Sequence, residues 1–184
     1  LEEIEAANPQ PLPLAMGLGL VVLASSFYWV VELNSEVSID QLSPGFSLFV
    51  FSLLAATTVI FHYSIMFWVG LKTNVTVSMR TSIDGILLQA YFTGAQSYLP
   101  LASDMELTGS LEDKAKCSNI TLLALLGLSL LMDSIGTLFF APVLKIWGAH
   151  LLLYVFVISF PLKPLEGSDI FAVSKGMWLS LIHI

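Results

Sequence analysis

Long apolar runs with almost no charge constrain this chain more than any other sequence feature. The clearest run, residues 119–141, has Asp133 as its single charged side chain. A helix of about 20 apolar residues crosses the ~30 Å hydrocarbon layer of a bilayer. Charged residues make up only 11% of the 184 residues, against roughly a quarter in soluble domains. The sequence therefore predicts an all-α fold, a polytopic membrane helix bundle.

The runs predict a single transmembrane domain, residues 14–184, after a polar N-terminal tail, residues 1–13. We expect about four to six spans. They are placed near residues 14–33, 45–70, 85–101 (a partial or re-entrant span), 119–141 and 142–162, and residues 176–184 start a further helix. Residues 71–83 alternate polar and apolar side chains, which predicts a short strand or β-hairpin after the second span. Residues 102–118 are interpreted as a charged loop.

Positive charges indicate how the spans are oriented. All lysines and arginines except Lys145 fall in residues 71–118 and 163–175, and loops rich in these residues face the cytoplasm. The spans after residue 118 then form a hairpin that turns on the outside. His62, late in the second span, and Glu166, after the last full span, are expected to lie within reach of each other.

Net charge and cysteine content exclude several classes of function. The net charge is −7, and no basic patch is present, so nucleic acid is not an expected partner. The single cysteine, Cys117, excludes an internal disulfide and a thiolate metal cluster. The expected partners are the lipid bilayer and other integral membrane subunits.

His62 is the first candidate for chemistry. It begins the sequence H-Y-S-I-M, so His62 and Met66 share one helix face. An active zincin has H-E-x-x-H here, with two zinc-binding histidines and a glutamate as general base. Tyr63 and Met66 occupy the positions of the glutamate and the second histidine. The alternative is that His62 is a hydrogen-bonded packing residue, although polar residues within membrane helices are often functional.

Glu166, Asp133 and His150 are the other candidates. Glu166, in P-L-E-G-S-D, is interpreted either as a metal ligand or as a solvated helix end. Asp133 lies inside a span beside several hydroxyl groups, so it either bonds to these hydroxyls or contacts another subunit. His150 could face Asp133 across the hairpin.

The segment F-P-L-K-P-L-E-G-S-D-I-F-A-V-S-K-G-M-W-L-S-L, residues 160–181, resembles the site-2 protease family of intramembrane zinc metalloproteases, in its archaeal and bacterial group. In that group a P-L-D-G turn is followed by a K-V-F-x-W-N-K-x-V-W-L pattern. The matching positions are Pro161, Pro164, Leu165, Gly167, Ile170, Phe171, Lys175, Trp178 and Leu179. Glu166 stands where the family has a zinc-binding aspartate. Upstream, H-Y-S-I-M-F-W-V-G-L-K-T-N is similar to the family's H-E-L-A-H-K-F-V-A-x-R-Y-G, and the resemblance covers roughly residues 50–184.

The resemblance implies a degenerate site. His62 matches a zinc ligand and Glu166 replaces another, whereas Met66 and Tyr63 replace the remaining ligand and the base. A catalytic zinc needs three protein ligands, and no group is left to take a proton from its water. The resemblance thus implies no catalytic residue, no expected cofactor, and a structural or accessory subunit in the plasma membrane of a prokaryote.

Two other functions stay open at the sequence level. One is a divergent intramembrane zinc metallopeptidase that uses His62, Glu166 and a third group such as His150. The other is a module that binds a transmembrane peptide or a lipid in the former substrate groove. Zinc is an ion compatible with such a site. Copper held by His62, Met66 and Glu166 is another, because imidazole and thioether ligands both suit copper.

Overall fold

The computed structural model describes residues 17, 19–28, 44–80, 83–95, 100, 104–161 and 165–183. The labelled elements, in chain order, are α2 (Pro44–Thr73), β1 (Thr76–Arg80), α3 (Ile83–Gly94), β2 (Asp104–Thr108), α4 (Leu111–Leu138), α5 (Pro142–Ile158), α6 (Gly167–Val173) and α7 (Lys175–His183). A further apolar helix covers Gly19–Tyr28. The predicted N-terminal tail lies outside the described residues. The described part is mainly helical, as predicted, with one small sheet.

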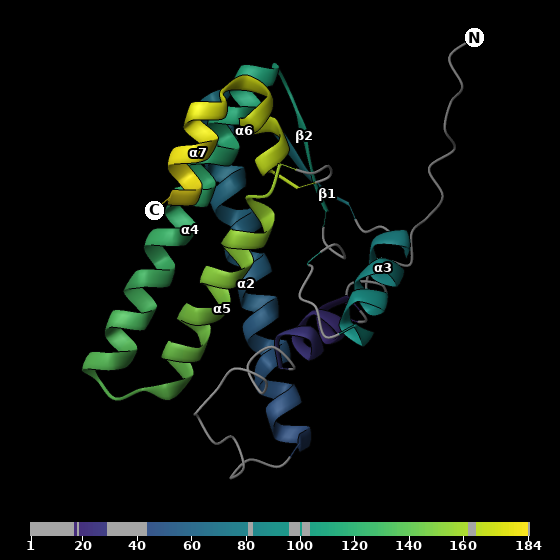
Figure 1. Ribbon diagram of the computed structural model, residues 1–184, viewed down its shortest axis with the longest axis vertical. Helices are drawn as coiled ribbons and strands as arrows, with labels where there is room; N and C mark the ends of the chain where they lie inside the picture. Colours follow the sequence, from purple (N-terminus) through teal and green to yellow (C-terminus); the bar gives the residue numbers. More distant parts are fainter. Residues whose placement is uncertain are drawn as a thin grey trace.

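Three long helices form the body of the molecule (Figure 1). α4 and α5 are an antiparallel hairpin, and α2 runs beside them in the same direction as α5. The short helices α6 and α7 lie at the end of the molecule where α2 and α5 finish and α4 begins. Glu166, at the start of α6, is therefore brought back toward the last turns of α2.

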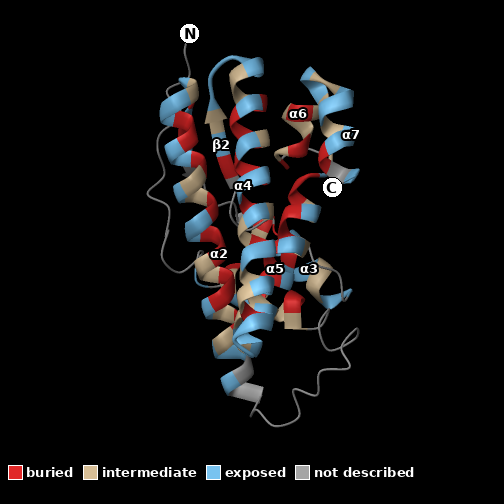
Figure 2. Cartoon of the chain, turned by 90° about the vertical axis from the view of Figure 1, so that its left-hand side faces the viewer, coloured by how far each residue is buried: buried red, intermediate tan, exposed pale blue. Residues whose placement is uncertain are grey.

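Within the described ranges, two helices are long and apolar enough to cross a membrane, Leu48–Thr73 and Leu111–Leu138. Only 33% and 28% of their apolar windows are buried inside the molecule, and Figure 2 shows exposed residues along much of α2 and α4. α3, with 12 residues, is about 18 Å long and too short to span. Two helices could thus span by length and composition, and the four to six spans stay a prediction.

The start of α4 differs from the sequence prediction. α4 begins at Leu111, because the Ser110 hydroxyl accepts a hydrogen bond from Asp113 N at 3.1 Å. This bond satisfies a backbone donor that a helix start otherwise leaves unpaired. Glu112 and Asp113 in the first turn also complement the helix dipole. The prediction of a charged loop over residues 102–118 was wrong, since this stretch contains β2 and the first turns of α4.

The predicted strand within residues 71–83 is confirmed as β1. Its partner is β2, paired antiparallel with Thr76 opposite Thr108. The predicted hairpin was wrong, because α3 lies between the two strands. Val75 and Val77 are buried and Thr76 and Ser78 exposed, so the period-two pattern does reflect one buried face.

The buried apolar residues form two clusters along α2. The larger lies among the helix Gly19–Tyr28, α2, α4, α5 and α6, and the smaller joins α2 and α4 to the sheet. Val59 belongs to the larger cluster and Met66 to the smaller. His62 thus lies between the two clusters.

Candidate functional site

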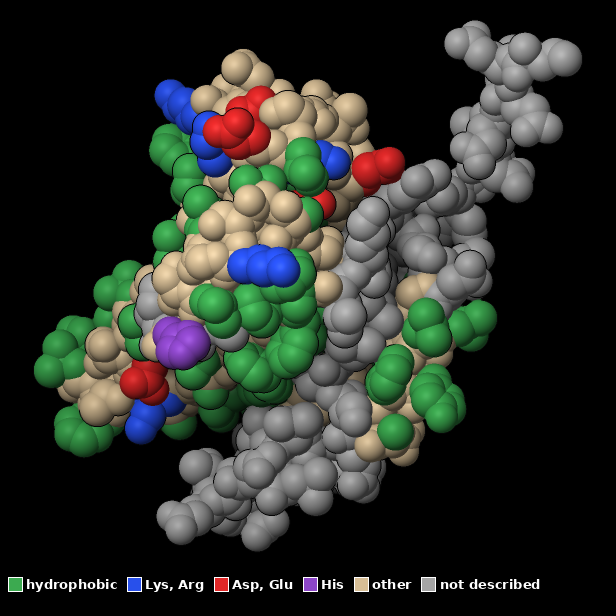
Figure 3. Space-filling view, turned by 45° about the horizontal axis from the view of Figure 1, so that its top comes forward, with side chains coloured by type: hydrophobic (Ala, Val, Ile, Leu, Met, Phe, Trp, Pro, Cys, Tyr) green, Lys and Arg blue, Asp and Glu red, His purple; other side chains and the backbone are tan. Residues whose placement is uncertain are grey.

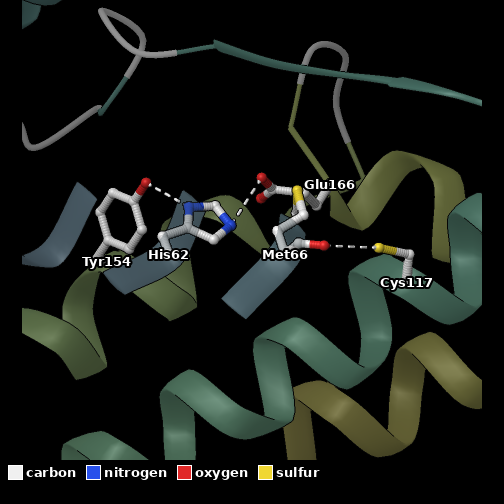
Figure 4. Close-up of polar contacts among 5 residues, drawn as sticks. All are labelled: His62, Met66, Cys117, Tyr154 and Glu166. Atoms are coloured by element: carbon white, nitrogen blue, oxygen red, sulfur yellow. Dashed lines mark hydrogen bonds and ion pairs between the residues drawn. The ribbon is translucent and has the colours of Figure 1, made fainter. Parts of the chain in front are cut away.

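His62 is a buried side chain on α2 whose exposed fraction is 1%. Its Nδ1 lies 2.9 Å from the hydroxyl of Tyr154 on α5. The two rings also meet edge to face, with centroids 5.5 Å apart. Figure 4 shows the imidazole between Tyr154 on one side and Glu166 on the other.

Glu166 directly precedes α6 and reaches the other ring nitrogen of His62. Its Oε1 lies 3.3 Å from His62 Nε2, and its side chain is 11% exposed. The prediction that these two residues lie within reach of each other is confirmed. Despite this distance, Nε2 makes no hydrogen bond of good geometry with any described residue. The Glu166 carboxylate therefore lies close to the imidazole without a well-formed hydrogen bond to it.

The turn that carries Glu166 is fixed by very close packing against the end of α5. A Cβ atom added at Gly167 would lie 1.9 Å from Ser159 O, so only glycine fits there. The same carbonyl oxygen accepts a hydrogen bond of 2.8 Å from Trp178 Nε1 on α7. Ile170, on α6, is fully buried. These contacts explain why glycine and tryptophan follow the carboxylate at these spacings.

Met66 lies one turn after His62 on the same face of α2 and is fully buried. Figure 4 shows its sulfur directed toward the Glu166 carboxylate. Cys117 on α4 packs behind it, with Sγ 3.7 Å from Met66 O. Tyr63 lies outside this group: it is only partly buried and stacks on Phe67, with centroids 6.1 Å apart.

The side chains present do not complete a zinc site. Catalytic zinc is held by three protein ligands. Within the ranges that the structure describes, no group of three or more His, Cys, Asp or Glu side chains is placed to hold a metal ion. His62 and Glu166 form a pair, with the Met66 thioether as the neighbouring soft donor.

His150 is part of a separate polar contact one turn earlier on α5. Its Nδ1 lies 3.4 Å from Thr58 Oγ1, which also accepts a hydrogen bond of 3.1 Å from Trp147 Nε1. Its ring packs on Phe27, with centroids 4.4 Å apart. His150 thus packs among the core helices and is not grouped with His62 and Glu166 as a third ligand.

Asp133 is exposed on α4, whereas His62 and His150 are buried. The neighbouring serines donate to backbone carbonyls, Ser129 to Gly148 O and Ser134 to Leu130 O. The approach of His150 to Asp133 was predicted wrongly. Gly148, not His150, lies against the Asp133 backbone, because the hairpin turns His150 toward α2.

Sequence reasoning missed Tyr154, the partner of His62. Its spacing of four residues from His150 places both on one face of α5, as His62 and Thr58 share one face of α2. A polar side chain four residues after His150 in an otherwise apolar run was the sequence signal that could have indicated Tyr154 as a partner of His62. Only the parallel packing of α2 and α5 shows which pairs meet.

We expect Tyr154→Phe to destabilise the protein by about 1–3 kcal/mol, because His62 Nδ1 loses its partner in a buried place. This corresponds to a fall in Tm of roughly 2–10 °C. Thermal unfolding in mild detergent, followed by circular dichroism, measures it. Tyr91→Phe is the matched control, since Tyr91 is 72% exposed. Equal Tm values for the two variants would contradict a stabilising role of the Tyr154 hydroxyl.

Comparisons of the chain with family models, with curated proteins and with solved structures gave no match. The resemblance to intramembrane metalloproteases therefore rests on the sequence segments quoted above. The contact between His62 and Glu166 is an observation of its own and does not depend on that resemblance.

Proposed function

We propose that this chain is a catalytically inactive relative of the intramembrane zinc metalloproteases, a pseudoprotease that serves as a structural or accessory subunit of a membrane protein complex. In this proposal it is a multi-pass protein of the plasma membrane of a prokaryote. The observation that carries the proposal is the buried contact between His62 and Glu166. Tyr63 and Met66 stand where a base and a third ligand would be needed.

The contacts around His62 support a structural role. His62 links α2 to α5 through Tyr154 and α2 to the turn before α6 through Glu166. These segments are far apart in the sequence. A buried hydrogen bond in an apolar core, such as that between His62 Nδ1 and the Tyr154 hydroxyl, favours one arrangement of the helices over its alternatives.

The outer surface of the long helices supports burial against lipid and other membrane subunits. Several large apolar side chains of α2 and α4 are more than half exposed: Phe49, Leu53, Ile60, Trp68, Leu71, Leu130, Leu131 and Leu138. Apolar surface of this extent on a soluble monomer is unusual. Charged side chains appear on the end of the molecule formed by α6, α7 and the start of α4 (Figure 3).

Metal content tests the inactive site directly. We expect the protein, purified in mild detergent without chelators, to contain less than about 0.1 zinc or copper per chain, because two protein ligands are fewer than a catalytic site uses. Elemental analysis measures this, alongside cleavage of a model transmembrane peptide. His62→Ala is compared with His183→Ala, which removes an exposed histidine. One zinc per chain that is lost only in His62→Ala, with zinc-dependent cleavage, would overturn the proposal.

The accessory role has a separate test. We expect the tagged chain to purify from native membranes with another integral membrane protein at a fixed ratio. Purification of this chain alone, with no other integral membrane protein across several mild detergents, contradicts the accessory role.

A further inference from the structure

The α4–α5 hairpin carries two charged side chains of opposite sign about one helical turn apart. Between Cys117 and Pro161 the sequence has only Asp133 and Lys145 as charged residues. Asp133 lies on α4 and Lys145 on α5, and both are exposed. A charged side chain on a membrane-spanning helix is costly unless it is paired or reaches water.

Two glycines show how close these charged residues lie along the hairpin. A Cβ atom added at Gly136 would lie 2.7 Å from Lys145 N, and one added at Gly148 would lie 2.8 Å from Asp133 N. The antiparallel helices therefore touch at both places. Gly136 is three residues after Asp133, so the two charged residues are separated by about one helical turn along the hairpin.

Neither charge is neutralised by a described residue. Neither residue takes part in the ion pair of Lys116 with Glu112 or in the contact of His62 with Glu166. The hydroxyls beside Asp133 are engaged with backbone carbonyls. A carboxylate on α4 and an ammonium group on α5, about one helical turn apart, are thus both exposed beside the seam between α4 and α5.

The surroundings of the seam suit a contact with another helix pair. On α5, Leu152 lies two turns after Lys145 on the same face, and on α4, Leu130 lies one turn before Asp133; both are about half exposed. Ala149, which is small, is exposed one turn after Lys145 on the same face of α5. Small side chains let membrane helices approach closely, and polar groups then strengthen the association.

We propose that a second copy of this chain docks on the α4–α5 seam, so that Asp133 of each copy pairs with Lys145 of the other. The patch carries one charge of each sign, so it is complementary to itself in a two-fold arrangement. Association would bury two charge pairs and the apolar border together. This inference depends on the membrane placement in the proposed function, but not on the inactivity of the His62 site.

Charge reversal in mixed copies tests the proposal. Asp133→Lys alone would oppose lysine to lysine, and Lys145→Asp alone would oppose aspartate to aspartate. We expect each variant to dimerise at least about tenfold more weakly than the wild type, which is ~1.4 kcal/mol or more. Co-expressed with two different tags, the variants should form a mixed dimer, because both pairs are then restored. Förster transfer between labelled copies in nanodiscs and two-step tag purification measure the association.

Several outcomes would overturn the proposal. A wild-type protein that stays monomeric at every protein-to-lipid ratio would overturn it. A mixture of the two variants that dimerises no better than either variant alone would also overturn it, since the charges would then pair within one chain. If the reversed variants do not fold, as judged by thermal unfolding, Asp133→Asn and Lys145→Gln replace them, and unchanged dimerisation of both would reject the pairing. Release of the chain from membranes by alkaline extraction would show instead that the membrane placement itself is wrong.

Discussion

Replacing Gly167 by alanine is expected to lower the Tm of the protein by roughly 5–10 °C, corresponding to a loss of about 2–3 kcal/mol. The added methyl group would lie 1.9 Å from Ser159 O. That oxygen belongs to the residue that caps the C-terminal end of α5, and it accepts the hydrogen bond from Trp178, so it is not free to move away. The turn before α6 must shift instead, and Glu166 then moves away from His62.

The control for this variant is Gly127→Ala. Gly127 lies within α4, and a Cβ atom there would meet nothing within 4 Å. Alanine favours the helix over glycine by about 1 kcal/mol, so we expect an unchanged or slightly higher Tm. Thermal unfolding in the same detergent compares the two. A Gly167→Ala protein as stable as Gly127→Ala would show that the turn is not packed as described.

The second large effect is a gain of zinc when the ligand set is rebuilt. We expect the double substitution Tyr63→Glu and Met66→His to raise the zinc content from near zero to about one per chain. It creates the sequence H-E-x-x-H, and two histidines with Glu166 would form the three-ligand set found in thermolysin-like sites. Met66 is fully buried and one turn from His62, so a histidine there would face the same space.

Two comparisons make this test specific. Met66→His with Glu166→Ala should bind zinc much more weakly, because only two ligands remain. Tyr63→Glu alone should bind none, because the base of a zincin is not a ligand. Zinc content is measured after dialysis against a weak chelator. A rebuilt protein that folds but binds no zinc would show that His62 and Glu166 are not placed as two members of a metal site.

Much of the helical fold is readable from the sequence because it depends on local patterns. Apolar runs located α2 and α5 to within about four residues at each end, and the alternation of side chains located β1. The start of α4 was missed because a capping serine outweighs the charges that follow it. The partner of β1 was missed because strand pairing joins residues on either side of α3, and no local pattern encodes such a contact.

The site was predictable only in part for a similar reason. The prediction that His62 and Glu166 lie within reach of each other is confirmed by their distance of 3.3 Å, whereas the membrane orientation from which it was drawn stays a prediction. Tyr154 and Ser159 could not be selected in advance, because their roles depend on how α5 packs against α2 and the turn. His150 looked as suitable as Tyr154 in sequence, but the packing turned its ring toward Thr58.

The two polar contacts between α2 and α5 have the same spacing: Thr58 with His150, and His62 with Tyr154, are each separated by 92 residues. Parallel helices joined at two equal offsets cannot slide past each other without breaking both contacts. A slide of one turn would set Thr58 opposite Tyr154 and leave His62 opposite the apolar Ile158. It would also move the imidazole by about 5–6 Å relative to the Glu166 carboxylate, since one helical turn rises by that amount. The two contacts thus fix the register of α2 against α5, and with it the position of His62 relative to the turn that carries Glu166.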